Sequence, residues 1–229
     1  MSEGPDGAAR RGRPPMSDQR RRQQRLDISR HAVRLFREQG VAATTGEQIA
    51  AAAGVSERTL WRHFRSKESC VEPLLTRTVD DFKGVLRSWP PGLELAEHLE
   101  AEYRLLPDSS RADIEAVLAV VRLTRDEPTL RAVWLVLHER AEPTFAEVLG
   151  ARMGLPPAGL EVRVRAAGMN TALRVVTDDL AWAAAEGLAP EAMDRYRERL
   201  AEALRVVLRI PSPDEVTSTL KVGQRTAET

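Results

Sequence analysis

The chain has 229 residues, and its 34 Lys and Arg balance 34 Asp and Glu, so total charge alone predicts no nucleic-acid partner. The length suits one or two domains. A single cysteine, Cys70, excludes a disulfide framework and a cysteine-based zinc site. No apolar run approaches the ~20 residues of a membrane span, and no apolar segment follows the charged start as in a signal peptide. We therefore expect a soluble, cytoplasmic protein of the all-α class, because strand-forming residues are scarce.

The charges are unevenly distributed along the chain. Residues 1–79 contain 15 Lys and Arg against 9 Asp and Glu, whereas the remainder contains 19 against 25. A basic first third followed by an acidic remainder predicts a DNA-binding end joined to a domain with another role.

Residues 1–17 are rich in Gly, Pro and Arg, and we expect a disordered basic arm there. Within it, Arg10-Arg11-Gly12-Arg13-Pro14 resembles an AT-hook, in which Arg11 and Arg13 would lie along a narrow minor groove. The alternative is a basic tail that adds only electrostatic affinity, and the motif is too short to decide between them.

Residues 18–66 are predicted to form a helix-turn-helix domain. Its first helix runs over 18–39, with Ser17 as the N-cap and Gly40 as the stop. The second helix begins at Thr44 or Thr45, since both positions fit a capping box. Gly54 then supplies a turn with positive φ, and Ser56 caps the third helix.

The third helix has an arginine face. Leu60 and Phe64 are four residues apart and are expected to point inward. The side chains that the helical wheel directs outward or to the flanks are Arg58, Thr59, Trp61, Arg62, His63 and Arg65. Outward arginines in a major groove can pair with guanine, while flanking donors hold phosphates. The alternative is an ordinary charged surface, which is disfavoured because acids are nearly absent from this face.

Spaced residues from 20 to 70 together resemble the TetR family of bacterial transcriptional regulators. These residues are Thr44-Thr45-x-Glu47-Gln48-Ile49-Ala50, Ala53-Gly54-Val55-Ser56, Thr59-Leu60-Trp61, His63-Phe64 and Ser66-Lys67-Glu68. The resemblance implies a homodimer with a small DNA-binding domain and a larger helical domain that binds a ligand. It also implies that ligand binding usually releases DNA.

By position, the resemblance assigns DNA contacts to several side chains, with Lys67 on a phosphate at a helix start. Further contacts are expected from the basic arm, from the helix starts and from the arginine face. The full set of expected DNA contacts is Arg11, Arg13, Thr44, Thr45, Ser56, Arg58, Thr59, Trp61, Arg62, His63 and Lys67. The chain departs from the family at Gly46, where a larger residue is usual, and at Trp61, where tyrosine is commoner. Gly46 is expected to loosen the first turn of the second helix.

Residues 67–210 are predicted to be a helical regulatory and dimerisation domain, and 211–229 a flexible tail. About nine helices are expected in the whole chain. Pro73 should kink the fourth helix or move its start, and Pro143 should kink or split a later one. The other predicted helices cover 93–106, 110–125, the segment from Pro128, 160–186 and 190–208.

The helix predicted over 160–186 is apolar on two sides. One stripe contains Val162, Met169 and Leu173, and the opposite stripe contains Val164 and Val175. One face can pack against its own domain, so the other face is expected to pack against a partner subunit. We expect this helix and the 190–208 helix to form a four-helix dimer interface. The alternative is a larger core within a single chain.

No enzyme motif is present, so we expect neither catalysis nor a cofactor. Glu94, His98 and Glu102 share a helix face, but a solvated face explains them better than a metal site. Trp134, His138 and Asn170 border apolar stripes and are candidates to line a ligand pocket. The alternative for these three is an ordinary place in the core or an interface.

These observations predict a homodimeric repressor that an unidentified small, mostly apolar ligand releases from a palindromic DNA operator. Two alternatives stay open. In the first, the second domain only dimerises and no effector exists. In the second, the chain is a helical small-molecule-binding protein or enzyme without specific DNA binding.

Overall fold

The computed structural model describes residues 17–105 and 110–208. These residues form α-helices and one 3₁₀ helix, with no strand among them, which confirms the all-α prediction. The elements are α1 (Asp18–Gln39), α2 (Gly46–Ala52), α3 (Glu57–His63), η1 (Glu68–Val71), α4 (Glu72–Ser88), α5 (Leu95–Glu102), α6 (Arg111–Leu123), α7 (Pro128–Glu139), α8 (Glu142–Met153), α9 (Leu160–Ala183) and α10 (Ala192–Leu208).

Prolines decide two of the helix boundaries. Pro73 lies in the first turn of α4, so the helix starts later than Ser66-Lys67-Glu68, and a 3₁₀ turn fills the gap. Pro143 likewise lies in the first turn of α8 and splits the predicted helix into α7 and α8. A proline is tolerated there because the first amides of a helix lack intrahelical acceptors. With this split, the described residues contain ten α-helices rather than about nine.

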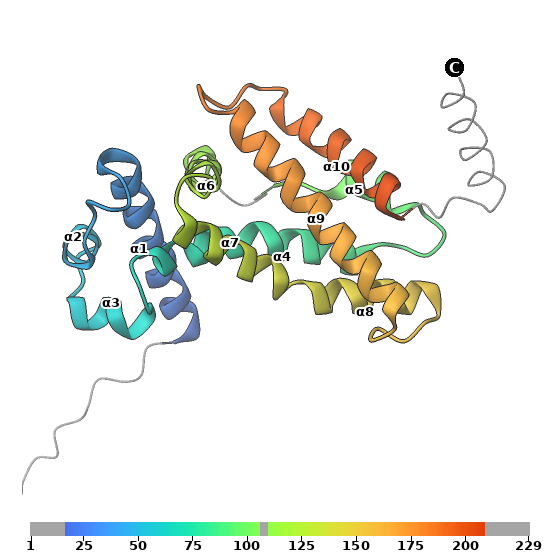
Figure 1. Ribbon diagram of the computed structural model, residues 1–229, viewed down its shortest axis with the longest axis horizontal. Coiled ribbons are helices and arrows are strands. Elements are labelled where there is room, and N and C mark those ends of the chain that lie inside the picture. Colours follow the sequence, from blue (N-terminus) through green and yellow to red (C-terminus); the bar gives the residue numbers. More distant parts are fainter. Residues whose placement is uncertain (1–16, 106–109, 209–229) are drawn as a thin grey trace, which may run out of the picture.

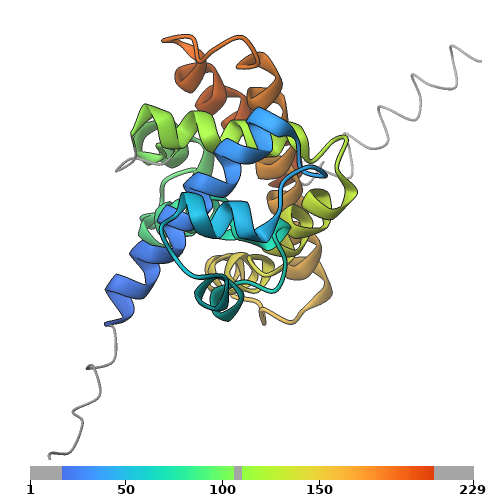
Figure 2. The ribbon, with the colours of Figure 1, turned by 90° about the vertical axis from the view of Figure 1, so that its left-hand side faces the viewer.

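The helices form a small head and a larger body (Figure 1). The head consists of α1, α2 and α3, at one end of the molecule, and the body consists of α4 to α10. Viewed from the head, α1 crosses in front of the body, as Figure 2 shows. It packs on η1, α4 and α6 as well as on α2. A continuous set of buried apolar side chains therefore runs from the head into the body.

An ion-pair cluster joins the head to the body. The Arg30 guanidinium of α1 donates to both carboxylate oxygens of Asp113 on α6, at 2.8 and 2.6 Å. Arg77 of α4 donates to the same carboxylate at 3.5 Å. Asp113 is buried, and the hydrogen bonds from Arg30 lower its pKa. Three helices are thus held by one bidentate carboxylate.

The long helix α9 buries only one of its two apolar stripes. Val162, Met169 and Leu173 are almost inaccessible and pack in the body core. On the other side, Val164 and Val175 keep 61% and 44% of their surface exposed. The helices α9 and α10 lie side by side at the edge of the body (Figure 1). In the described ranges, no helix is long and apolar enough to cross a membrane.

Candidate nucleic-acid interface

Local capping and turn chemistry build the α2–turn–α3 unit. The Thr45 hydroxyl accepts from the Gln48 amide while the Gln48 side chain accepts from the Thr45 amide, a complete capping box. Gly54 makes the turn at φ 64°, and the Ser56 hydroxyl accepts from the Thr59 amide. These caps confirm the predicted turn, and of the two candidate capping residues they identify Thr45 as the N-cap of α2.

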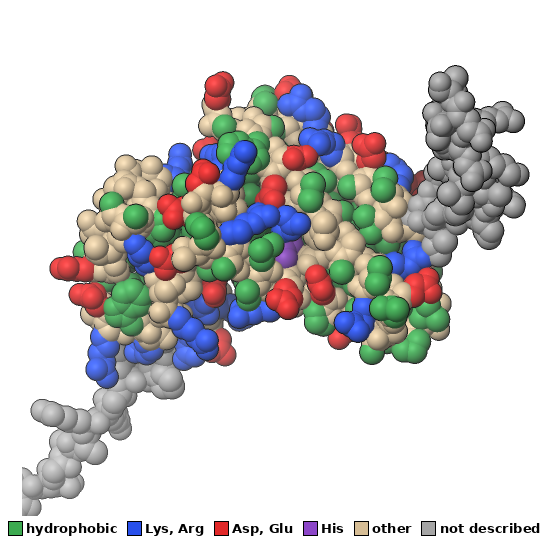
Figure 3. Space-filling view, in the orientation of Figure 1, with side chains coloured by type: hydrophobic (Ala, Val, Ile, Leu, Met, Phe, Trp, Pro, Cys, Tyr) green, Lys and Arg blue, Asp and Glu red, His purple; other side chains and the backbone are tan. Residues whose placement is uncertain are grey.

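The outward side of α3 carries unpaired positive charge. Leu60 and Phe64 are buried, as predicted, and Arg58, Trp61 and Arg62 are exposed on the other side. Within residues 17–105 and 110–208, neither arginine side chain has an ion pair. Lys and Arg side chains gather over α3 and the start of α1 in Figure 3. The arrangement provides free guanidinium donors on a convex helix surface.

Arg65 is exposed, as predicted, but it does not belong to α3, because the helix ends at His63. Phe64 has extended backbone angles, so the 100° periodicity stops before Arg65. Arg65 is exposed beyond the helix end, and its backbone amide donates to the Ser69 hydroxyl. Thr59 is half-buried, with its hydroxyl 3.0 Å from that of Ser56.

His63 connects α3 to the start of α1. Its Nε2 lies 3.1 Å from the Gln24 amide oxygen and donates to it. Burial lowers the His63 pKa below 6.5, and the positive charges of Arg62, Arg25 and Arg21 lower it further. The ring is therefore neutral at pH 7. The contact with Gln24 was missed from the sequence, since nothing local pairs residues 39 positions apart.

Thr44 is the expected contact residue that the structure places inside the head. Its side chain is 1% exposed, and its hydroxyl donates to the Gly40 carbonyl at 2.7 Å and accepts from Gln39. Thr45, by contrast, is exposed at the α2 N-terminus. We retain Thr45 and not Thr44 as a candidate phosphate contact, because a buried hydroxyl with satisfied hydrogen bonds offers nothing to DNA.

Lys67 also turns toward the protein. Its ammonium donates to the carbonyls of Val41, Ala42 and Thr44, at 2.6, 3.3 and 2.8 Å. An ammonium has three N–H donors, so these contacts use all of them. In this geometry Lys67 ties the loop before α2 to η1 instead of clamping a phosphate.

The two departures from the family pattern lie against each other. A Cβ added to Gly46 would lie 2.1 Å from Cζ2 of Trp61. The first turn of α2 is therefore covered by the indole and closed by the Thr45 capping box, instead of being loosened as expected. The remaining expected contacts, Arg11 and Arg13, lie outside the described residues.

Comparisons with known proteins agree with this geometry. Residues 28–74 match the family model described as bacterial regulatory proteins, tetR family. The HTH-type transcriptional regulator TcmR of Streptomyces glaucescens is 31% identical over 148 residues, covering 62% of this chain and 66% of TcmR. The HTH-type transcriptional repressor KstR2 of Rhodococcus jostii is 40% identical over 108 residues, covering 47% of this chain and 50% of KstR2. The matched part of the chain thus spans about two thirds of the length of TcmR and half of the length of KstR2.

The chain belongs to the TetR family. The relatives that match this TetR-family chain are named as transcriptional regulators, not as enzymes. The structure of Salmonella enterica GusR shares the fold, with a TM-score of 0.54 at 17% identity, over 82% of this chain and 96% of GusR.

The three expected pocket residues of the TetR-family body meet in its core. Trp134, His138 and Asn170 are between 1% and 5% exposed. The Asn170 oxygen accepts from His138 Nδ1 at 2.7 Å, and its amide donates to Glu142 and to the His138 carbonyl. The Trp134 and His138 rings meet edge to face, with 4.1 Å between their centroids. Their mutual bonding favours the alternative interpretation as core residues.

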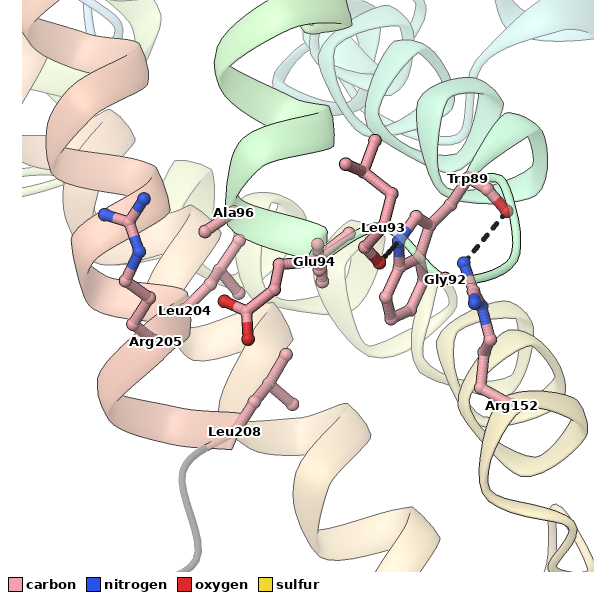
Figure 4. Close-up of a pocket in the computed structure, with 10 residues that line it drawn as sticks. Trp89, Gly92, Leu93, Glu94, Ala96, Arg152, Leu204, Arg205 and Leu208 are labelled. Atoms are coloured by element: carbon pink, nitrogen blue, oxygen red, sulfur yellow. Dashed lines mark hydrogen bonds between the residues drawn. The ribbon is translucent and has the colours of Figure 1, made fainter.

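A hollow of about 710 Å³ opens elsewhere in the TetR-family body, where the α4–α5 loop meets α8 and the end of α10 (Figure 4). Its apolar lining residues are Trp89, Leu93, Leu95, Ala96, Leu204 and Leu208. Arg152 stacks on the Trp89 ring at 3.7 Å and donates to the Trp89 carbonyl. Figure 4 shows the Glu94 side chain pointing toward α10, beside Leu204 and Leu208.

The Glu94, His98 and Glu102 set does not form a metal site. His98 is buried, and its Nε2 donates to the Val85 carbonyl at 2.9 Å, while both glutamates are exposed. Among residues 17–105 and 110–208, no group of three or more His, Cys, Asp or Glu could hold a metal ion. Burial raises the Cys70 pKa to about 12, so this thiol is inert at pH 7.

Proposed function

We propose that this protein is a sequence-specific DNA-binding regulator that acts as a repressor. The observation that carries the proposal is the outward side of α3, where Arg58 and Arg62 are exposed without acidic partners. Each guanidinium can make a bidentate pair with guanine O6 and N7 in the major groove. Thr45, Ser56 and Trp61 lie beside them as candidate phosphate donors. Because its proposed partner is DNA, the protein is expected to act in the bacterial cytoplasm.

We infer that the regulator acts as a homodimer through α9 and α10. A single head offers a small footprint, whereas a two-fold dimer presents two α3 helices to successive major grooves about 34–36 Å apart. The exposed stripe of α9 supports this arrangement, because a soluble chain seldom leaves such apolar residues unpaired along one line. A dimer of this kind recognises a palindromic operator.

We place the effector in the 710 Å³ hollow rather than beside His138. The hollow lies within the size range of known ligand sites, and its leucines and Trp89 suit a small, mostly apolar molecule. The ligand shifts the regulator away from DNA only to the extent that it binds the two states differently.

Selection of bound DNA from a random pool tests the function. The expected result is an enriched palindrome whose half-sites are one helical turn apart. Recovery of unrelated sequences, with affinity that depends on salt but not on sequence, would contradict specific recognition and favour a small-molecule-binding protein without an operator.

A further inference from the structure

The α2–α3 contact at Gly46 and Trp61 has unusually little space. A Cβ at position 46 would lie 2.1 Å from Trp61 Cζ2 and 2.6 Å from Cη2. Carbon atoms in contact are normally about 3.5–4.0 Å apart. No residue with a side chain therefore fits at position 46 while the indole keeps its place.

The backbone does not require glycine at this position. Gly46 is the first residue of α2, and it is absent from the positive-φ glycines, which include Gly40 and Gly54. Glycine within a helix is less stable than alanine by roughly 0.5–1 kcal/mol. Since the backbone gains nothing from glycine here, the space it leaves for the indole is its structural contribution.

The Trp61 ring is packed on one side and open on the other. It is 44% exposed and shares the outward side of α3 with Arg58 and Arg62. In the part of the chain that the structure describes, its indole N–H has no acceptor. The ring thus bridges the first turn of α2 and the DNA-facing side of α3 with a donor still available.

We propose that Gly46 is a positioning residue for operator binding. It seats the indole of Trp61 against α2, and so sets both the direction of the indole N–H and the approach of α3 to DNA. The inference rests on the proposed function and adds to it a residue with no side chain of its own.

Loss of the packing of the Trp61 indole against α2 should affect DNA binding more than folding. An alanine at position 46 makes the ring swing outward or moves the start of α2 away from α3. The core residues Ile49 and Leu60, both 0% exposed, pack on other sides of these helices and keep their contacts. The head therefore stays folded, while its DNA-facing surface changes shape.

The test uses Gly46→Ala, Trp61→Tyr and the double variant, with Gly84→Ala as the matched control. Gly84 is also helical, and nothing lies within 4 Å of a Cβ added there. Affinity for the selected operator is measured by fluorescence anisotropy, with the melting temperature measured in parallel. We expect Gly46→Ala to bind about tenfold more weakly, a difference of about 1.4 kcal/mol. Gly84→Ala should bind as the parent does.

The double variant separates positioning from a simple loss of stability. Tyrosine lacks the fused ring atoms that collide with a Cβ at position 46, so Gly46→Ala should add little to Trp61→Tyr. Non-additivity of this kind measures coupling between the two positions. Losses that simply multiply, or a Gly46→Ala variant with parental affinity and sequence preference, would overturn the proposal.

A readout without DNA distinguishes this failure from failure of the proposed function. The Trp61 indole N–H resonance is identified by its absence in Trp61→Tyr. It should move in Gly46→Ala and stay in place in Gly84→Ala. An unmoved resonance in Gly46→Ala refutes the seating of Trp61, whereas a moved resonance without any specific DNA binding refutes only the regulatory function.

Discussion

Arg62 and Lys67 are cations close to the end of α3, but their side chains have different surroundings. Arg62 is exposed and has no ion pair among the described residues, whereas the Lys67 ammonium is surrounded by three carbonyls. The first can bind DNA at no cost to the fold, and the second cannot leave its acceptors without loosening the loop before α2. Two substitutions separate these roles.

Removal of Arg62 should weaken operator binding without destabilising the head. Arg62→Ala is expected to cost roughly 1–3 kcal/mol of binding and to relax the preference at the base pair it reads. Gel-shift titration against the selected operator and its single-base variants measures both effects. Arg87→Ala, at an exposed arginine near the opposite end of α4, serves as the control. Equal losses in both variants would indicate a general charge effect.

Removal of the Lys67 ammonium should instead destabilise the protein. Lys67→Met keeps the aliphatic stem but leaves the three carbonyls without their donor, at a cost of roughly 1–3 kcal/mol. Urea unfolding measures the change, with Lys83→Met as the comparison because the Lys83 ammonium pairs with the exposed carboxylate of Asp80. If Lys67 contacts a phosphate, the opposite pattern will appear: unchanged unfolding and weaker, less salt-dependent DNA binding.

The fate of individual residues shows what a sequence can predict. The caps at Ser17, Thr45 and Ser56 were recognisable because each hydroxyl bonds an amide three residues away. The acceptors of Lys67 lie 23 to 26 residues earlier, and periodicity gives no hint of them. The contact between Gly46 and Trp61 was equally invisible, although both residues were already noted as unusual.

At the scale of elements, a buried polar network joins α7, α8 and α9. Its members are His138, Asn170 and Glu142, linked by hydrogen bonds of 2.7 and 2.9 Å. The sequence grouped His138 and Asn170 as candidate pocket residues because both border apolar stripes, and the structure places the two side chains in contact. The sequence could not tell a packed core from a cavity, because that depends on how closely the facing helices approach.

This network predicts a pH-dependent stability. Burial lowers the His138 pKa to about 4, from an ordinary value of 6.5. Below pH 6.5 the His138 imidazole binds a proton in the unfolded chain but stays neutral in the folded chain. The free energy of unfolding therefore falls by about 1.4 kcal/mol per pH unit as the pH drops toward 4. Urea unfolding at pH 6.5 and pH 5 should show roughly 2 kcal/mol more loss in the parent than in His138→Gln. Parallel pH profiles would refute a neutral buried His138.

At the scale of the whole molecule, the head and the body share one core and one ion-pair cluster. Arg30 of α1 and Arg77 of α4 meet at Asp113 of α6, so a shift of α6 reaches the head through side chains already in contact. The sequence predicted both parts of the molecule from composition and periodicity. This cluster was not predictable, because its members are 36 and 83 residues apart.

The exposed stripe of α9 leads to the prediction of a dimer. Leu160, Val164, Val175 and Trp182 remain exposed along one side of a helix whose opposite side is buried. Burying apolar surface yields about 25 cal/mol per Å², so pairing two such stripes stabilises an interface substantially. Light scattering should therefore give twice the 25.4 kDa chain mass at micromolar concentration.

Charged substitutions on this stripe should separate the protomers. Val164→Glu combined with Val175→Glu places two carboxylates in each half of the interface, where burial without a partner is costly. The expected product is a folded monomer with an unchanged helical spectrum and little affinity for the palindromic operator. Val136→Glu, at an exposed valine of α7 outside the stripe, should leave the dimer intact. A double variant that stays dimeric would place the interface elsewhere.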